Sequence, residues 1–284
     1  MSQSSLIGVD IGGTKISAGL VQNGEVKTSS QQETPAKEDI NSITAAILNT
    51  IQELKTTDLQ AVGVGVPGLV DAAKGVVHTI TNIPALSDFP LARCLEKELG
   101  CPVYLDNDAN CFAVGEKHFG VGSSYDHIVA FTLGTGLGAA LILDGVLFNG
   151  KAGGAGEIGC LKYLDRDLEY FCSSQFFKDN YGADSLACAR AAGQGEARAL
   201  EFYKEYGRHL GQAISLAMAF LDPEVIILGG SITYAHQFFM PGVEEVLDQF
   251  PLKRISEGVE VMVGSLSDSA ILGAAALHYD HEQR

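Results

Sequence analysis

The sequence predicts an α/β protein with two domains, and three observations support this. The chain has 284 residues, enough for two domains of roughly 150 residues each. Apolar runs of strand length alternate with helical apolar patterns, which is typical of α/β units. A strand, glycine turn and strand near the start recur near the middle of the chain, and this suggests two similar domains facing each other.

The composition excludes several classes of protein. With 46% hydrophobic residues, 19% charged residues and 33 glycines, the chain is an ordinary globular protein whose loops can approach a ligand closely. The start resembles no signal peptide, and no apolar run reaches about 18 residues, so we expect a cytoplasmic protein without a membrane partner. A net charge of -16 opposes binding to nucleic acid. The six cysteines form no CxxC pair and are expected to be reduced thiols.

The first segment, residues 4–30, predicts three strands joined by two tight turns. The runs SLIGVDI, KISAGLV and EVKTSS are separated by a glycine turn at 12–14 and by Asn23-Gly24. An Asn-Gly pair between such runs is a strong hairpin signal. Rossmann and Walker loops join a strand to a helix, whereas this glycine turn joins two strands. It is therefore either a plain tight turn or a phosphate loop of another kind.

Residues 128–146 repeat this plan and favour the second alternative. The segment IVAFTLGTGLGAALILDGV has a turn at Gly134, Thr135 and Gly136 and a hairpin at Asp144-Gly145. Two glycine hairpins across one cleft could hold a phosphate chain from both sides. Because the protein is acidic, such a phosphate needs backbone N–H groups and a divalent cation rather than lysines.

The remaining segments predict further α/β units. Helices are expected over 39–54, 89–100, 107–120, 197–221 and 268–279, and strands over 61–68, 101–106 and 224–233. The last of these helices is rich in small residues, so we expect it to pack closely on another element.

Four polar residues are candidates for chemistry. Asn107 and Asp108 stand at a strand-to-helix junction, where they either cap the helix or bind a ligand. Glu157 lies in the glycine-rich segment GGAGEIG and either is a solvated loop acid or accepts hydrogen bonds from ligand hydroxyls. Asp10 ends an apolar strand, where a carboxylate either stabilises the turn or meets Mg²⁺, directly or through water.

Eight motifs together resemble the ROK family of sugar kinases, in the same order and over nearly the whole chain. They are VDIGGTKISAGLV, VGVPGLVD, TNIPALSDFPL, LDNDANCFAVGE, TLGTGLGAALILDG, GGAGEIG, VIILGGSIT and AILGAAAL. The resemblance implies the two-domain actin-like ATPase fold (hexokinase or ribonuclease H-like) with a cleft between the domains. Residues 1–106 plus 269–284 would form the N-terminal domain, and residues 107–268 the C-terminal domain. It also implies a homodimer.

The resemblance further implies phosphorylation of a hexose hydroxyl by ATP with Mg²⁺, glucose being the first candidate before fructose, mannose and N-acetylhexosamines. Asp108 would be the general base. The implied nucleotide-binding residues are Asp10 near the metal, Gly12, Gly13 and Thr14 in the first loop, Gly134, Thr135 and Gly136 in the second, and Gly229 and Gly230 beside the adenosine. The implied sugar-binding residues are Asn82, Asn107, Asp108 and Glu157.

The chain departs from the family after GEIG. Members of the family follow this motif with a histidine and a cysteine cluster that hold zinc, whereas here Cys160 replaces the histidine and the cluster is missing. Cys160 and Cys172 cannot make a four-ligand site of that spacing, so we predict no zinc. Glu169 is either the sugar-contacting glutamate of the family or an exposed helix acid. Two other readings are a sugar-sensing repressor, which would need a DNA-binding domain, and a non-catalytic sugar or ATP sensor.

Overall fold

The computed structural model describes residues 5–283, which divide into two compact units. The first unit contains the chain up to Ser124, the segment Gly145–Ala155 and the chain from Ser265 onward. The second unit contains Tyr125–Asp144 and Gly156–Gly264. This division differs from the predicted boundaries after residues 106 and 268. In the part of the chain that is described, no helix is long and apolar enough to cross a membrane.

The first unit is built on a five-stranded sheet of order β3-β2-β1-β4-β7. The first three strands along the chain are antiparallel neighbours, whereas β1, β4 and β7 run parallel. A small two-stranded sheet pairs β5 with β6. The strands of this unit are β1 (Ser5–Ile11), β2 (Lys15–Gln22), β3 (Glu25–Glu33), β4 (Leu59–Val66), β5 (Leu69–Asp71), β6 (Val76–Thr79), β7 (Val103–Asn107) and β10 (Val146–Leu147). Its helices are α1 (Ile40–Gln52), α2 (Leu91–Leu99), α3 (Asp108–Phe119) and α10 (Ser269–Gln283).

Local sequence signals explain several of these elements. Asn23 and Gly24 both have positive φ angles, 54° and 74°, as the predicted two-residue hairpin requires. Asp39 caps α1 by accepting a hydrogen bond from the Ser42 N–H. Gly100 ends α2 in the left-handed conformation with a φ of 72°. The predicted hairpin and both predicted helices are therefore confirmed.

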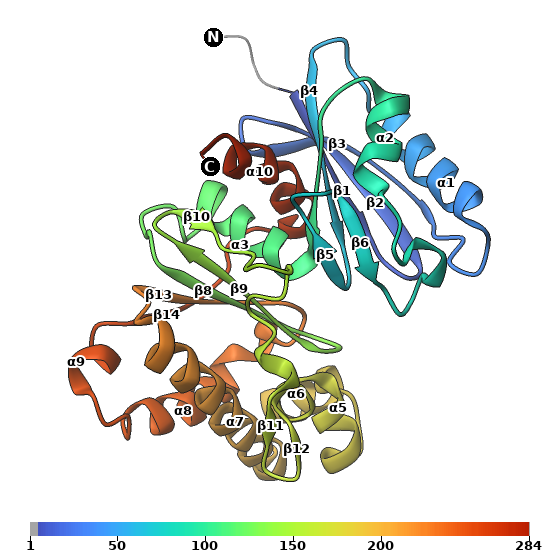
Figure 1. The fold of residues 1–284 in the computed structure, drawn as a ribbon. Helices are drawn as coiled ribbons and strands as arrows, with labels where there is room; N and C mark the ends of the chain where they lie inside the picture. Colours follow the sequence, from blue (N-terminus) through green and yellow to red (C-terminus); the bar gives the residue numbers. More distant parts are fainter. Residues whose placement is uncertain (1–4, 284) are drawn as a thin grey trace. The chain divides into compact units, whose positions relative to one another are not determined.

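Helices cover both faces of the sheet in the first unit (Figure 1). On one face, α1 and α2 pack against the strands through a large apolar core that includes Ile43, Ile47 and Leu95, all fully buried. On the other face lies α10, which also packs on α3. Because α3 packs on this terminal helix, it belongs to the first unit rather than to the second, where the predicted boundary placed it.

Close contacts made by glycines bring α10 onto the sheet. A Cβ atom on Gly63 of β4 would lie 1.7 Å from the Ala274 carbonyl oxygen, and one on Gly8 of β1 would lie 1.9 Å from that of Ile271. Similarly, a Cβ on Gly273 of α10 would lie 2.0 Å from the Cys111 carbonyl oxygen in α3. The close packing predicted for the small-residue helix is confirmed. It depends on glycines, because only a residue without a Cβ atom lets the two backbones approach so closely.

The second unit is built on the strands β9, β8, β13 and β14, in that order. The first pair is antiparallel and the others are parallel. The strands are β8 (Ile128–Leu133), β9 (Leu137–Leu143), β11 (Lys162–Tyr163), β12 (Arg166–Asp167), β13 (Val225–Gly229) and β14 (Glu260–Val263). The helices are α4 (Leu168–Cys172), α5 (Ser174–Phe176), α6 (Ser185–Gly193), α7 (Ala197–Leu221), α8 (His236–Leu247) and α9 (Lys253–Ser256).

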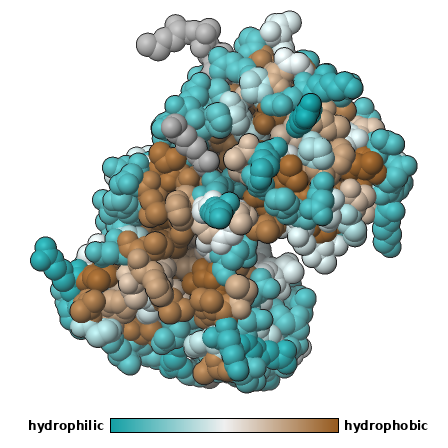
Figure 2. Space-filling model, viewed as in Figure 1, coloured by the Kyte–Doolittle hydropathy of each residue, from teal (hydrophilic) through white to brown (hydrophobic). Residues whose placement is uncertain are grey.

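The long helix α7 organises the second unit. It crosses α8 closely, since a Cβ on Gly207 would lie 2.0 Å from the Phe239 carbonyl oxygen. Beside this crossing, buried aromatic rings pack edge-to-face or tilted in a cluster that includes Phe176, Phe177 and Tyr206. On the visible surface of this unit, hydrophobic residues gather in broad areas bordered by hydrophilic ones (Figure 2). The short helices α4 and α5, which contribute Phe171 and Phe176 to this aromatic packing, were not predicted, and neither was α6.

Candidate functional site

The first unit brings its predicted site residues to the carboxyl ends of neighbouring parallel strands. Asp10 lies near the end of β1 opposite Gly65 of β4, and Asn107 ends β7 opposite Val66. The chain turns directly from Asn107 into α3, whose first residue is Asp108. Ligands of α/β proteins bind at this edge of a parallel sheet.

Asn107 is the N-cap of α3, as one of its two predicted roles requires. Its side-chain oxygen accepts a hydrogen bond of 2.7 Å from the Asn110 N–H, and the side chain is buried. The cap therefore fixes where α3 starts and hence where Asp108 projects. Asp108 in turn accepts a bond of 2.9 Å from the Ala109 N–H and is exposed.

The glycine turn between β1 and β2 is held by its neighbours along the sheet. The Gly12 N–H donates to the Lys15 carbonyl oxygen at 2.8 Å, and the Thr34 hydroxyl donates to the Gly12 carbonyl oxygen at 2.7 Å. A Cβ on Gly13 would lie 2.9 Å from the Asn82 Cβ, so this loop and Asn82 lie against each other. Thr14, the third loop residue, is exposed.

Burial raises the pKa of both carboxyl groups at this edge. The pKa of Asp10 is raised first by burial and then by the negative charge of Asp108, while Lys15 lowers it in part. Solvent reaches Asp108, but the protein atoms around its carboxyl group still raise the pKa, and the bond from Ala109 lowers it in part. Both groups are therefore readier to accept a proton or a cation than a freely solvated aspartate.

The second glycine turn, residues Gly134 to Gly136, lies between β8 and β9 in the second unit. The Gly134 N–H donates to the Gly136 carbonyl oxygen at 3.1 Å, and the Ser174 N–H at the start of α5 donates to the Gly134 carbonyl oxygen at 2.8 Å. Gly230 follows β13 with a φ of 88°, and a Cβ there would lie 2.3 Å from the Leu133 carbonyl oxygen. The loop after Gly229 therefore packs against the end of β8, next to the turn.

Glu169 lies beside this second turn. Its Oε2 atom accepts a hydrogen bond of 3.2 Å from the Leu137 N–H, and a Cβ on Gly136 would lie 2.5 Å from the same oxygen. Its own Cβ lies 3.4 Å from where a Cβ on Gly159 would be, so Glu169 also adjoins the segment that carries Glu157. Glu157 itself is exposed and precedes a short 3-10 helix, Ile158–Cys160.

The two cysteines near this segment lie in different environments. Cys160 is exposed and its thiol donates to the Glu157 carbonyl oxygen at 2.9 Å, whereas Cys172 is buried. Burial raises the pKa of the Cys172 thiol far above its usual range. Within residues 5–283, no group of three or more His, Cys, Asp or Glu side chains could hold a metal ion.

The predicted site residues thus gather in two sets, one in each unit. The set in the first unit comprises Asp10, Gly12, Gly13, Thr14, Asn82, Asn107 and Asp108. The set in the second unit comprises Gly134, Thr135, Gly136, Glu157, Glu169, Gly229 and Gly230. Sequence reasoning missed Ser174, which holds the second turn through its backbone, and for such a contact the sequence carries no signal.

Comparisons with known proteins identify the family and the fold of this chain. The ROK family profile matches residues 6–281. The glucokinase of Thermotoga maritima is 31% identical over 310 aligned positions, covering 98% of both chains. The crystal structure of the ROK hexokinase from Thermus thermophilus has a TM-score of 0.83 at 25% identity and covers 99% of this chain and all of the other. A ROK family glucokinase from Streptomyces griseus, in complex with glucose and AMPPNP, has a TM-score of 0.78 at 27% identity and covers 96% of this chain and 99% of its own. The chain therefore belongs to the ROK family and has the two-domain actin-like ATPase fold of its sugar kinases.

Proposed function

We propose that this ATP-dependent sugar kinase transfers the γ-phosphoryl group of ATP to a hydroxyl of glucose, with Asp108 as general base. The observation that carries the proposal is the pair of carboxyl groups with raised pKa, Asp10 and Asp108, at the carboxyl ends of β1 and β7. The glucokinase relatives support the choice of sugar. Fructose, mannose and N-acetylhexosamines are the alternative acceptors.

Asp108 would take the proton that the reaction releases. The sugar oxygen forms a bond to the γ-phosphorus, the bond from that phosphorus to the bridging oxygen breaks, and ADP leaves with the electron pair. The hydroxyl proton passes to the Asp108 carboxylate. A base whose pKa is raised toward neutrality accepts this proton more readily, and such catalysis contributes roughly 10² to 10⁴ in rate.

Asp10 is the residue that would hold Mg²⁺, directly or through water. Burial and the charge of Asp108 disfavour its ionised form, and a nearby divalent cation would relieve both effects. Mg²⁺ needs few protein ligands, since it is commonly bound by one or two carboxylates together with substrate phosphates. When bound, Mg²⁺ would supply positive charge to the phosphates. In this acidic chain the other positive partners of the phosphates would be backbone N–H groups.

The other site residues would position the two substrates. Gly12 to Thr14 in the first unit and Gly134 to Gly136 in the second would bind phosphates through backbone N–H groups, and Gly229 and Gly230 would lie along the adenosine. The second turn adjoins the loop that contains Gly230, which supports a continuous nucleotide surface in that unit. Sugar hydroxyls would be bound by four polar side chains besides Asp108, namely Asn82, Asn107, Glu157 and Glu169.

The deciding experiment is turnover measured by coupled ADP release with Mg²⁺, against glucose, mannose, fructose, N-acetylglucosamine and N-acetylmannosamine. We expect glucose to be preferred, and Asp108→Asn to lower kcat by roughly 10² to 10⁴ while calorimetry still detects glucose binding. Asp58→Asn is the matched control, because it removes one carboxylate of the same unit that is exposed and bonds to Ser5. Unchanged turnover in Asp108→Asn would exclude the assigned base.

We also propose that the protein is a cytoplasmic homodimer. The second unit exposes the large apolar side chains of Leu161, Leu216 and Phe220, the last with 83% of its surface accessible. They line a mainly apolar cavity of about 320 Å³, which a second copy could cover. The six cysteines are all free, as expected in a reducing compartment. Light scattering should give twice the monomer mass, and Phe220→Asp should give the monomer.

A further inference from the structure

A buried carboxylate stands directly before the proposed base. Asp106 is the penultimate residue of β7, and only 3% of its surface is accessible to solvent. A charged group in such a place is costly unless donors surround it. The function proposed above gives it no role, although it lies two residues from Asp108.

This carboxylate accepts three hydrogen bonds, two from the start of α3 and one from Asn149. Its Oδ1 atom accepts from the Asn107 N–H at 2.8 Å and from the Asn110 side-chain amide at 2.6 Å. Its Oδ2 atom accepts from the side-chain amide of Asn149 at 2.6 Å. Bonds to an ionised acceptor are about twice as strong as neutral ones, so this carboxylate is a firm junction.

The junction connects two segments that lie far apart in the sequence. Asn107 and Asn110 belong to the start of α3, where the Asn107 cap determines the direction of Asp108. Asn149 belongs to the segment Gly145–Ala155, and its carbonyl oxygen accepts a bond of 3.2 Å from the Ala155 N–H. Two residues after Ala155 the chain reaches Glu157.

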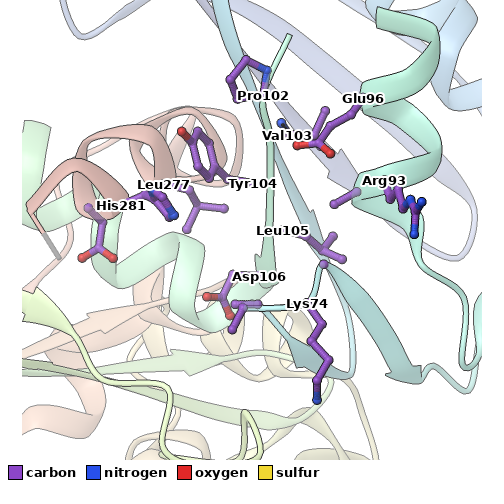
Figure 3. Close-up of a pocket in the computed structure, with 15 residues that line it drawn as sticks. Lys74, Arg93, Glu96, Pro102, Val103, Tyr104, Leu105, Asp106, Leu277 and His281 are labelled. Carbon is purple, nitrogen blue, oxygen red and sulfur yellow. Dashed lines mark hydrogen bonds between the residues drawn. The ribbon is translucent and has the colours of Figure 1, made fainter. Parts of the chain in front are cut away.

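The alternation of side chains along β7 places the Asp106 carboxylate on the face of the strand where these three hydrogen bonds can form. Figure 3 shows Leu105 turned toward α2 with Arg93 and Glu96, and the Asp106 carboxylate turned to the opposite side of the strand, where α10 carries Leu277 and His281. Both side chains line one cavity of about 760 Å³. A period of two residues in a strand requires this alternation.

We propose that Asp106 is a positioning residue for phosphoryl transfer, because its carboxylate holds the strand-to-helix turn at Asn107 and Asp108 and the Asn149 segment in one fixed arrangement. It touches neither reacting atom, and it acts through the direction of Asp108. The proposal rests on the function proposed above. A displacement of about 1 Å in a catalytic group lowers the rate by up to roughly 100-fold, so loss of the hydrogen bonds to Asp106 should lower mainly kcat.

The test exchanges the donor and the acceptor. Asn149→Asp places two carboxylates against each other, and rotation of either side chain cannot restore a hydrogen bond. The double variant Asp106→Asn with Asn149→Asp restores the bond with its direction reversed, since the new amide donates to the new carboxylate. Asp106→Asn alone keeps an oxygen for Asn107 and Asn110, and the Asn149 amide can rotate to accept from the new amide.

We expect Asn149→Asp to lower kcat with glucose and MgATP by roughly 10- to 100-fold, with the KM for ATP changed by less than about threefold. Asp106→Asn should lower kcat by a smaller factor, and the kcat of the double variant should exceed that of Asn149→Asp by at least roughly tenfold. Asp58→Asn serves again as the charge control. Wild-type kcat in a folded Asn149→Asp variant, or a double variant no faster than Asn149→Asp, would overturn the proposal.

Hydrogen exchange separates this proposal from the proposed function. In Asn149→Asp, backbone amides in 107–112 and 148–155 should exchange faster than in the wild type, and the double variant should restore their protection. If the wild type phosphorylates none of the five sugars, the proposed function fails, and the exchange result alone decides whether Asp106 joins the two segments. Unchanged exchange in both segments would refute the junction itself.

Discussion

Gly63→Ala should destabilise the first unit, because the new methyl group has no room. Gly63 lies in β4, a central strand, and the Cβ atom would lie 1.7 Å from the Ala274 carbonyl oxygen and 2.5 Å from its carbonyl carbon. Outside its own residue and the two chain neighbours, a Cβ atom in a protein essentially never comes within 3.0 Å of a heavy atom, so α10 would have to move away by more than 1 Å. Neither contact is to a flexible side chain, and both groups belong to regular elements.

Moving α10 would also loosen its close contacts with Gly8 of β1 and with Cys111 of α3. Overpacking of this kind costs about 1–3 kcal/mol, and with backbone on both sides we expect about 3 kcal/mol. For a chain of this size that corresponds to a fall in melting temperature of roughly 6–12 °C, measurable by differential scanning calorimetry.

Gly193→Ala is the matched control for this prediction. Gly193 is the last residue of α6, and no heavy atom lies within 4 Å of the position of its Cβ. An alanine there should be neutral or should stabilise by up to about 1 kcal/mol. The packing argument is refuted if Gly63→Ala melts within about 2 °C of the wild type.

Three further predictions concern the site. Asp108→Asn should raise the free energy of unfolding at neutral pH, because the folded state binds the Asp108 proton more tightly than the unfolded chain and ionised Asp108 therefore destabilises the fold. This destabilisation develops as the pH rises from 3.8 through the raised pKa, so urea unfolding at a series of pH values should show the variant's gain in stability disappear in acid. A variant less stable than the wild type at neutral pH would contradict this. Gly136→Ala should displace Glu169 from the Leu137 N–H, since the Cβ would lie 2.5 Å from Oε2; we expect the KM for glucose to rise roughly tenfold in steady-state kinetics, and an unchanged KM would count against Glu169 as a sugar ligand. Elemental analysis of chelator-washed protein should find well below one zinc per chain, and stoichiometric zinc would contradict the absence of a site at Cys160.

Much of the fold could be predicted because its signals are local. The turns Asn23-Gly24 and Asp144-Gly145 each need two residues with positive φ angles, and the structure has them at all four positions. The helical face of Ile43, Ile47 and Ile51 is fully buried, as its spacing predicts. The missed elements β5, β6, α4 and α5 have three to five residues, too few for a pattern to identify them. The 12-residue helix α8 was also missed, and it contains Pro241, a residue that normally ends a helix.

One feature of the candidate site, the Asn107 cap, was predictable for the same reason. Asn107 caps α3 because a side-chain oxygen three residues before a backbone N–H is a local geometry that the sequence encodes. The domain boundary was less predictable. Nothing in the sequence of α3 indicates that it packs on α10, a helix more than 140 residues later in the chain, where Gly273 lies against the Cys111 carbonyl oxygen. Boundaries depend on such long-range contacts, which periodicity does not report.

Local sequence patterns were sufficient to predict the two glycine hairpins, the alternation of strands and helices, and the carboxylates Asp10 and Asp108 at the ends of β1 and β7. The contacts between groups far apart in the chain became known from the fold alone: Asp106 accepts from the Asn149 amide, and Glu169 accepts from the Leu137 N–H. The fold also decided the raised pKa values of Asp10 and Asp108, because these depend on the atoms packed around each carboxyl group and on the charge nearby. Turns and caps depend on hydrogen bonds between residues close together in the sequence, which a local pattern can encode. Burial and charge effects on a carboxyl group add up over residues that are distant in the sequence and that only folding brings together.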